Sequence, residues 1–177
     1  MNTAIFFADG FEEIEGLTVV DMFRRAGIPI QTVSISDSLT VTGSHDIKVQ
    51  ADCLLADFDF NTVEMLILPG GMPGTTNLSK CEPLCDALMQ FSRQGRYLAA
   101  ICAAPSILGG MGLLKGKRAA CYPSVEDKLS GAVISRLPVV QDGNIITSRG
   151  MGTAIDFALK LTEILFDREK AEELAAS

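Results

Sequence analysis

The sequence is poor in the residues on which several common kinds of function depend. It has a single histidine, His45, and no block of consecutive lysines and arginines. A net charge of −7 disfavours a nucleic-acid partner, because proteins that bind phosphate backbones present a basic face. No apolar run approaches the roughly 20 residues that cross a bilayer. We therefore expect neither nucleic acid nor a membrane as a partner.

The cysteines also lack the pattern of a disulfide framework. They are odd in number and irregularly spaced, at Cys53, Cys81, Cys85, Cys102 and Cys121. This usage is typical of the reducing cytoplasm. Cys81 and Cys85 have no further Cys or His at the spacing of metal ligands, so the sequence predicts no metal site there. The chain opens without a basic segment before its short apolar run, and we expect no signal peptide.

Strand-like and helix-like segments alternate along the chain. The expected strands are 4–8, 30–35, 65–68, 97–101, 118–121, 139–141 and 144–147, and the expected helices are 11–26, 83–93, 106–108, 125–129 and 153–166. Residues 39–50 are predicted to form a projecting hairpin. This order indicates one α/β domain over residues 1–177 with a mostly parallel sheet. In such sheets, ligands bind beyond the carboxyl ends of the strands.

Cys102 stands where the strand 97–101 meets the next helix. Free backbone N–H groups and the helix dipole favour an anion at that place. We therefore predict that the pKa of the Cys102 thiol falls below its ordinary value, as in a nucleophile or an oxidation sensor. The alternative is a buried cysteine that acts only as a small hydrophobic side chain.

Glu15 shares a face of the first predicted helix with three apolar side chains, Val19, Met22 and Ala26. Burial of a carboxylate raises its pKa, so Glu15 could hold a proton near neutral pH and donate it to a sulfur atom. The alternative is a solvated carboxylate at the start of a helix. That alternative is the interpretation for Glu12 and Glu13.

Gly70 and Gly71 follow the buried strand 65–68. Two glycines let the backbone turn sharply, and amides aimed at the elbow would form an oxyanion hole. The alternative is an ordinary strand-to-helix turn without a role in binding or catalysis. If strands 4–8, 65–68 and 97–101 are adjacent, their carboxyl ends bring the glutamate cluster, these glycines and Cys102 together.

The lone histidine argues against proteolysis. A Cys-His hydrolase needs an imidazole within reach of the thiol, and His45 falls in the predicted hairpin instead. Tyr122 offers only a phenol, a side-chain type that is too weakly acidic to act as an efficient base at pH 7. A flavin is also disfavoured, because the carboxylates of the loop 9–13 would repel its phosphate.

Four segments together resemble the ThiJ/PfpI superfamily: Gly10–Glu15, Leu68–Gly71, Ala99–Pro105 and Thr147–Gly150. The chain is most similar to the branch that holds the parkinsonism-associated protein and its bacterial YajL-type relatives. The resemblance implies a flavodoxin-like three-layer sandwich, a homodimer and activity without a cofactor.

The resemblance also implies roles for individual residues. Cys102 matches the oxidation-prone nucleophile of the family, and Glu15 matches its protonated acid. Gly70 and Gly71 match backbone donors that line the pocket. Ala103, directly after the nucleophile, is expected to contribute to the same oxyanion or substrate site.

Three further positions follow from the resemblance. Arg149 matches an arginine near the pocket. Tyr122 stands where the parkinsonism-associated protein and the family's peptidases carry a histidine, and it is a candidate substrate contact. His45 stands where that protein has an arginine that reaches across the dimer, so it is a candidate contribution from the partner subunit.

Two functions remain open from the sequence. The first is a cysteine-dependent glyoxalase or deglycase that acts on methylglyoxal or glycation adducts. The second is a redox sensor or chaperone-like protective protein without significant turnover, in which Cys102 is oxidised and Glu15 hydrogen-bonds the oxidised sulfur. Both place nearly the same physical demands on the two residues.

Overall fold

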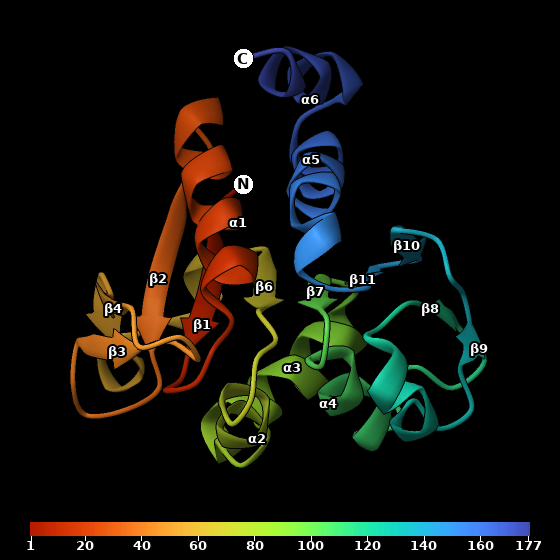
Figure 1. The fold of residues 1–177 in the computed structure, drawn as a ribbon, viewed down its shortest axis with the longest axis horizontal. Coiled ribbons are helices and arrows are strands. Elements are labelled where there is room, and N and C mark those ends of the chain that lie inside the picture. Colours follow the sequence, from red (N-terminus) through yellow and green to blue (C-terminus); the bar gives the residue numbers. More distant parts are fainter.

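A seven-stranded sheet forms the centre of the structure, a computed structural model that describes residues 1–177 (Figure 1). Its strand order is β10-β11-β7-β6-β1-β2-β5, and only the β10–β11 pair is antiparallel. The strands are β1 (Thr3–Phe7), β2 (Ile30–Ser34), β5 (Cys53–Leu54), β6 (Met65–Leu68), β7 (Tyr97–Ile101), β10 (Val139–Asp142) and β11 (Ile145–Ser148). The central strands are apolar along their whole length because both faces of the sheet are covered.

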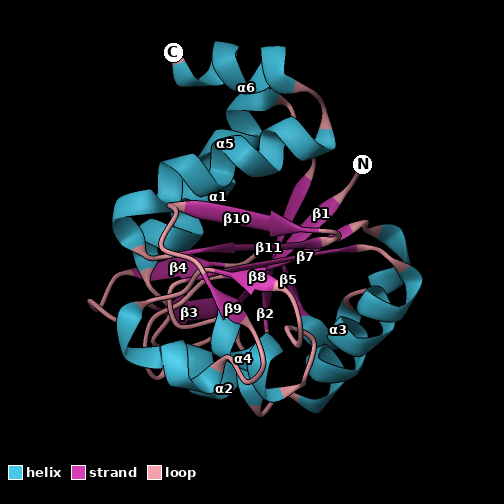
Figure 2. Ribbon diagram, turned by 90° about the vertical axis from the view of Figure 1, so that its right-hand side faces the viewer, coloured by secondary structure: helices cyan, strands magenta, loops and turns pink.

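Helices cover both faces of this sheet (Figure 2). One face carries α1 (Glu13–Ala26), α5 (Ala154–Leu165) and α6 (Arg168–Ala175). The other carries α2 (Gly74–Ser79), α3 (Glu82–Gln94) and α4 (Pro105–Gly110). The 3-10 turns are η1 (Leu55–Asp57), η2 (Phe60–Thr62), η3 (Pro123–Lys128) and η4 (Met151–Thr153). Two separate hydrophobic clusters fill the spaces between the layers.

Two small sheets lie outside the central one. The strands β3 (Thr40–Thr42) and β4 (Lys48–Gln50) form the hairpin that the sequence predicts over residues 39–50. The strands β8 (Arg118–Ala119) and β9 (Val133–Ile134) pair in parallel. No helix of the chain combines the length and the apolar character needed to cross a membrane.

The prediction of an α/β domain with a mostly parallel sheet is confirmed. Strands β7, β6 and β1 are adjacent at the centre of the sheet, which is the order that brings Cys102, the glycines and the glutamate cluster to one edge. Helix α1 ends where Gly27 adopts a left-handed conformation, as the sequence indicates. The expected strand 118–121 is shorter, since only Arg118 and Ala119 pair. The short helix α2 was not predicted.

Candidate active site

Cys102 lies on a sharp turn between β7 and α4. Its φ angle is 64°, a left-handed value that is unusual for a residue other than glycine. The turn is fixed on both sides, because the Cys102 N–H donates to the carbonyl oxygen of Ser148 at 3.0 Å and the Tyr122 N–H donates to the Cys102 carbonyl at 2.8 Å. The thiol is half-buried and lines a cavity of about 620 Å³. The strand-to-helix elbow predicted from the sequence is therefore present.

Glu15 faces the interior from the first turn of α1. Its side chain is 1 % exposed, and its Oε2 atom accepts a hydrogen bond of 2.9 Å from the Gly70 N–H. Burial raises the pKa of Glu15 to about 7, although hydrogen bonds with Cys102 and Gly70 oppose the rise. The predicted raised pKa of this acid is confirmed.

The pKa of the Cys102 thiol is raised to about 12, so the expectation that it would fall is wrong. Burial is the main cause, and the charge of Glu15 and its hydrogen bond to the thiol add to it. The N–H groups of Ala103 and Gly71 act in the opposite direction but are outweighed. Between about pH 7 and 12, the two side chains together hold a single proton.

Gly70 and Gly71 have different functions in the site. The Gly70 amide is engaged by Glu15, so it cannot serve as the free oxyanion donor that the sequence suggested. The Gly71 amide instead faces the sulfur of Cys102. Ala103 provides the second such amide, in line with its expected place in the site.

The loop after β6 packs backbone against backbone on the start of α1. The Glu12 N–H donates to the Gly70 carbonyl oxygen at 2.9 Å. Gly71 has a φ of 88°, and a Cβ atom there would overlap the backbone nitrogen of Glu12. A Cβ atom on Gly70 would lie 2.6 Å from both the Cys102 Cβ and the Glu15 Oε2. Both positions therefore require glycine.

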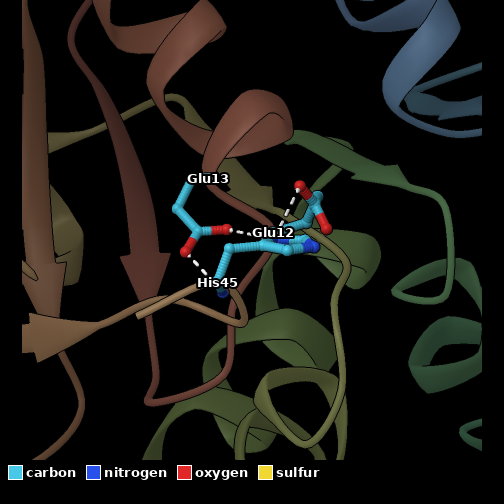
Figure 3. A group of neighbouring side chains, drawn as sticks. All are labelled: Glu12, Glu13 and His45. Carbon is cyan, nitrogen blue, oxygen red and sulfur yellow. Dashed lines mark hydrogen bonds and ion pairs between the residues drawn. The ribbon is translucent and has the colours of Figure 1, made fainter. Parts of the chain in front are cut away.

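His45 lies in the β3–β4 hairpin and binds glutamates of its own chain (Figure 3). The ring Nδ1 atom of His45 is 2.9 Å from Glu13 Oε2 and 3.6 Å from Glu12 Oε1. The backbone N–H of His45 donates to Glu13 Oε1 at 2.7 Å. These hydrogen bonds lower the pKa of Glu13 to about 2. Glu13 is only 4 % exposed, so its interpretation as a solvated carboxylate is wrong.

The same glutamates raise the pKa of His45 through a hydrogen bond and their charges. The side chains of Glu12, Glu13 and His45 offer ligand atoms within 4.8 Å of one another, a spacing that a metal ion could use. The Glu13 oxygens already accept from His45 and from the Ser44 hydroxyl. The cluster therefore has a complete structural explanation in which Glu13 anchors the hairpin to α1.

Tyr122 lies between two hollows of the surface. It lines the cavity that contains Cys102 and also a second hollow of about 340 Å³ next to it. Arg149 and Gly150 line only the second hollow, so Arg149 does not line the cavity that contains the thiol, although a Cβ atom on Gly150 would lie 4.0 Å from the Cys102 sulfur. One guanidinium nitrogen of Arg149 is buried without a hydrogen-bond partner. The positive charge of Arg149 also reaches Cys121, where it opposes the raised pKa caused by burial.

The cavity has walls that the sequence reasoning missed. They include Thr75 on α2, Ile107 on α4 and Lys128 at the end of η3. The elements α2, α4 and η3 are each six residues long, too short for a periodic pattern, so the sequence carries no signal for these walls.

Residues 1–164 match the model of the DJ-1/PfpI family. The chain is 40 % identical to "Protein DJ-1 homolog B" of Arabidopsis thaliana over 95 % of its own length, but it spans only 39 % of that relative. It is 33 % identical to "Glutathione-independent glyoxalase DJR-1.2" of Caenorhabditis elegans, with 92 % of this chain and 87 % of the relative covered.

Among solved structures, the oxidized DJ-1 of Toxoplasma gondii superposes with a TM-score of 0.95 at 35 % sequence identity. The match covers 99 % of this chain and 96 % of that one. The similarity therefore extends over the central sheet, both helix layers and the elbow, and the superfamily resemblance drawn from the four motifs is confirmed.

Proposed function

The chain belongs to the DJ-1/PfpI family, and from that premise we propose that it is a cofactor-independent glyoxalase. It converts methylglyoxal and related 2-oxoaldehydes to 2-hydroxy acids, and by the same chemistry it reverses early glycation adducts. The observation that carries the proposal is the pair at the elbow. A thiol lies at the edge of a cavity, beside an acid whose pKa is about 7.

The first step is the attack of the Cys102 sulfur on the aldehyde carbon. A carbon–sulfur bond forms, the π electron pair moves to the aldehyde oxygen, and the thiol proton passes to the Glu15 carboxylate. The raised pKa of the thiol means that the proton leaves during the attack rather than before it. The N–H groups of Gly71 and Ala103 stabilise negative charge near the sulfur.

The second step moves hydrogen between two carbon atoms of the substrate. Glu15 first gives its proton to the aldehyde oxygen, which completes the hemithioacetal and returns Glu15 to a carboxylate. It then takes the proton from the former aldehyde carbon, the C–H electron pair forms the carbon–carbon double bond, and the keto oxygen takes up a proton to give an enediol. Return of a proton to the neighbouring carbon gives the thioester of a 2-hydroxy acid. Water then displaces the thiol. One carbon is oxidised while its neighbour is reduced, so no external oxidant or reductant is needed.

The test is the turnover of methylglyoxal by purified variants. Cys102→Ser should abolish lactate formation, whereas Cys81→Ser, a cysteine outside the cavity, should retain it. The kcat/KM of the wild type should rise with pH through about 7 as the pair loses its first proton, and Glu15→Gln should remove this dependence. Unchanged turnover by Cys102→Ser would disprove the mechanism.

A redox-sensing role is the second candidate. The amides of Gly71 and Ala103 and the carboxyl of Glu15 surround the sulfur with groups that can bind a sulfinate. The solved Toxoplasma relative is itself described as oxidized. Titration with peroxide followed by mass spectrometry should place the first oxidation on Cys102. Equal oxidation of all five cysteines would count against a sensor.

We also propose that the protein is a homodimer, as its resemblance to the family implied. Large apolar side chains are exposed on the first turn of α1 (Ile14), on η4 (Met151) and at the start of α5 (Ile155), and α1 packs against α5. Sedimentation of the wild type and of an Ile155→Glu variant would test this. A monomeric wild type at micromolar concentration would refute it.

A further inference from the structure

The cavity at Cys102 is a groove that runs along one side of α4. Its residues on this helix are Ser106, Ile107 and Gly110, and Ala103 lies two residues before the helix begins. Ser106 and Ile107 precede Gly110 by four and three residues, so they share one helix face with it. A rise of about 1.5 Å per residue makes this face about 6 Å long. Residues of helix α2 and of the turn η3 line the rest of the cavity, and both elements pack against α4.

The groove is far larger than methylglyoxal requires. Its volume of about 620 Å³ falls in the range of roughly 300–1,000 Å³ typical of sites for drug-sized ligands. A three-carbon substrate bound to Cys102 would fill only the end next to the elbow. The remaining length has apolar walls from Met72, Ile107 and Val125, which suit the carbon chain of a longer molecule.

Lys128 lines the groove beside the last turn of α4. Its carbonyl oxygen lies where a Cβ atom on Gly109 would approach to 2.6 Å, so its backbone packs on the last turn of α4. Lys128 is the only charged residue that lines the cavity. Its ammonium group makes no ion pair or hydrogen bond within the chain, unlike Lys117, Lys160 and Lys170.

A second hydrogen-bonding group in the wall has no partner. Thr75 is 5 % exposed and lines the groove, and its hydroxyl forms no hydrogen bond within the chain. The oxygen itself has almost no accessible surface, so this hydroxyl is not presented to a molecule in the groove. The groove thus offers a nucleophile at the elbow and one unpaired cation among uncharged walls.

We propose that the preferred substrates are 2-oxoaldehydes whose carbon chain ends in an anionic group, which Lys128 binds. This inference rests on the proposed glyoxalase function and specifies its substrate class. With 4,5-dioxopentanoate, one water is consumed and the product is 2-hydroxyglutarate. The aldehyde carbon is oxidised and the keto carbon is reduced, as with methylglyoxal. A carboxylate and a phosphate ester share the required charge.

The test compares the kcat/KM of three substrates. They are 4,5-dioxopentanoate, the phosphate ester 2-oxo-3-phosphooxypropanal and the neutral 2-oxohexanal. We expect the wild type to prefer an anionic substrate over the neutral one by about five- to tenfold, which is modest because Lys128 is exposed. The ratio of the two anionic substrates tells carboxylate from phosphate.

Lys128→Gln should remove this preference, chiefly through a higher KM, because the contact is remote from the reacting carbons. Lys48→Gln is the matched control. It removes an equal charge from β4, outside the groove, and should keep the preference. Two results would refute the substrate class and leave the glyoxalase function standing, provided that methylglyoxal is turned over. In the first, the wild type shows no preference for anionic over neutral substrates. In the second, Lys128→Gln keeps the full preference.

A binding measurement decides the inference even if no 2-oxoaldehyde is turned over, an outcome that would refute the glyoxalase function. Calorimetry would compare 2-hydroxyglutarate with 2-hydroxyhexanoate. Binding of the dianion that is at least about fivefold tighter, and lost in Lys128→Gln, would support the anion site of the groove. Equal affinity for both acids would refute it.

Discussion

Replacing Glu15 by glutamine should stabilise the protein at pH 8 but not at pH 4. Below its ordinary pKa of 4.5, the carboxyl is protonated in both the folded and the unfolded chain. Between 4.5 and about 7, the folded protein keeps a proton that the unfolded chain releases, so stability falls as pH rises. The free energy of unfolding falls by about 1.4 kcal/mol per pH unit over this interval, or about 3 kcal/mol in all. Glutamine carries no such penalty.

Urea denaturation of the wild type and of Glu15→Gln, at pH values from 4 to 8, would measure this effect. The difference in the free energy of unfolding should grow in favour of the variant and level off above pH 7. For a chain of this size, about 3 kcal/mol corresponds to roughly 6–12 °C in Tm. The glutamine oxygen can still accept the hydrogen bond from the Gly70 N–H. Any stability lost at this contact changes the difference between the two proteins by the same amount at every pH.

Glu82→Gln is the control, because Glu82 also lies in the first turn of a helix, α3, but its side chain is exposed. Its difference from the wild type should vary much less between pH 4 and 8. If the Glu15→Gln difference is also constant over this range, then Glu15 ionises with an ordinary pKa. The assignment of Glu15 as the proton carrier of the site would then fail.

Two other substitutions test the contacts around the site. Glu13→Gln should destabilise the protein at pH 7 by about 1–2 kcal/mol in urea denaturation, because the ionised Glu13 accepts hydrogen bonds from His45. The stabilisation by Glu13 is fully present above pH 4.5 and is lost as the pH falls through about 2. An equal loss at pH 2 and pH 7 would contradict this role. Gly70→Ala should cost about 1–3 kcal/mol and most of the methylglyoxal turnover, since its Cβ would crowd the reactive pair. Gly152→Ala, with open space around it, should change neither, and a fully active Gly70→Ala would refute the crowding.

The fold could be predicted from the sequence because its signals are local. Each central strand is a short apolar run with a turn at its end, and Gly27 and Gly95 mark the ends of α1 and α3. Helix α2 was missed because Gly74–Ser79 has few apolar residues and follows a proline, so neither periodicity nor propensity indicates a helix there.

The candidate site was predictable only in part. The burial of Glu15 follows from its apolar helix face, whereas the burial of Glu13 depends on His45, which is 32 residues away in the sequence. The pKa of Cys102 was predicted in the wrong direction because the helix N-terminus was considered without the burial of the thiol, which is the main cause, and without the nearby charge of Glu15. Such contacts between distant segments leave no pattern in the chain itself.

The tight fit of Gly70 and Gly71 against the start of α1 limits how the protein can be changed. Peptide groups rather than exchangeable side chains hold the acid and the sulfur at their separation, so mutation has few ways to adjust the reactive pair. The walls of the groove are formed largely by side chains such as Met72, Ile107 and Val125, although Gly74 and Gly109 also pack closely against backbone atoms. Engineering this protein to accept other aldehydes should therefore keep Gly70 and Gly71 and change the side chains that line the groove.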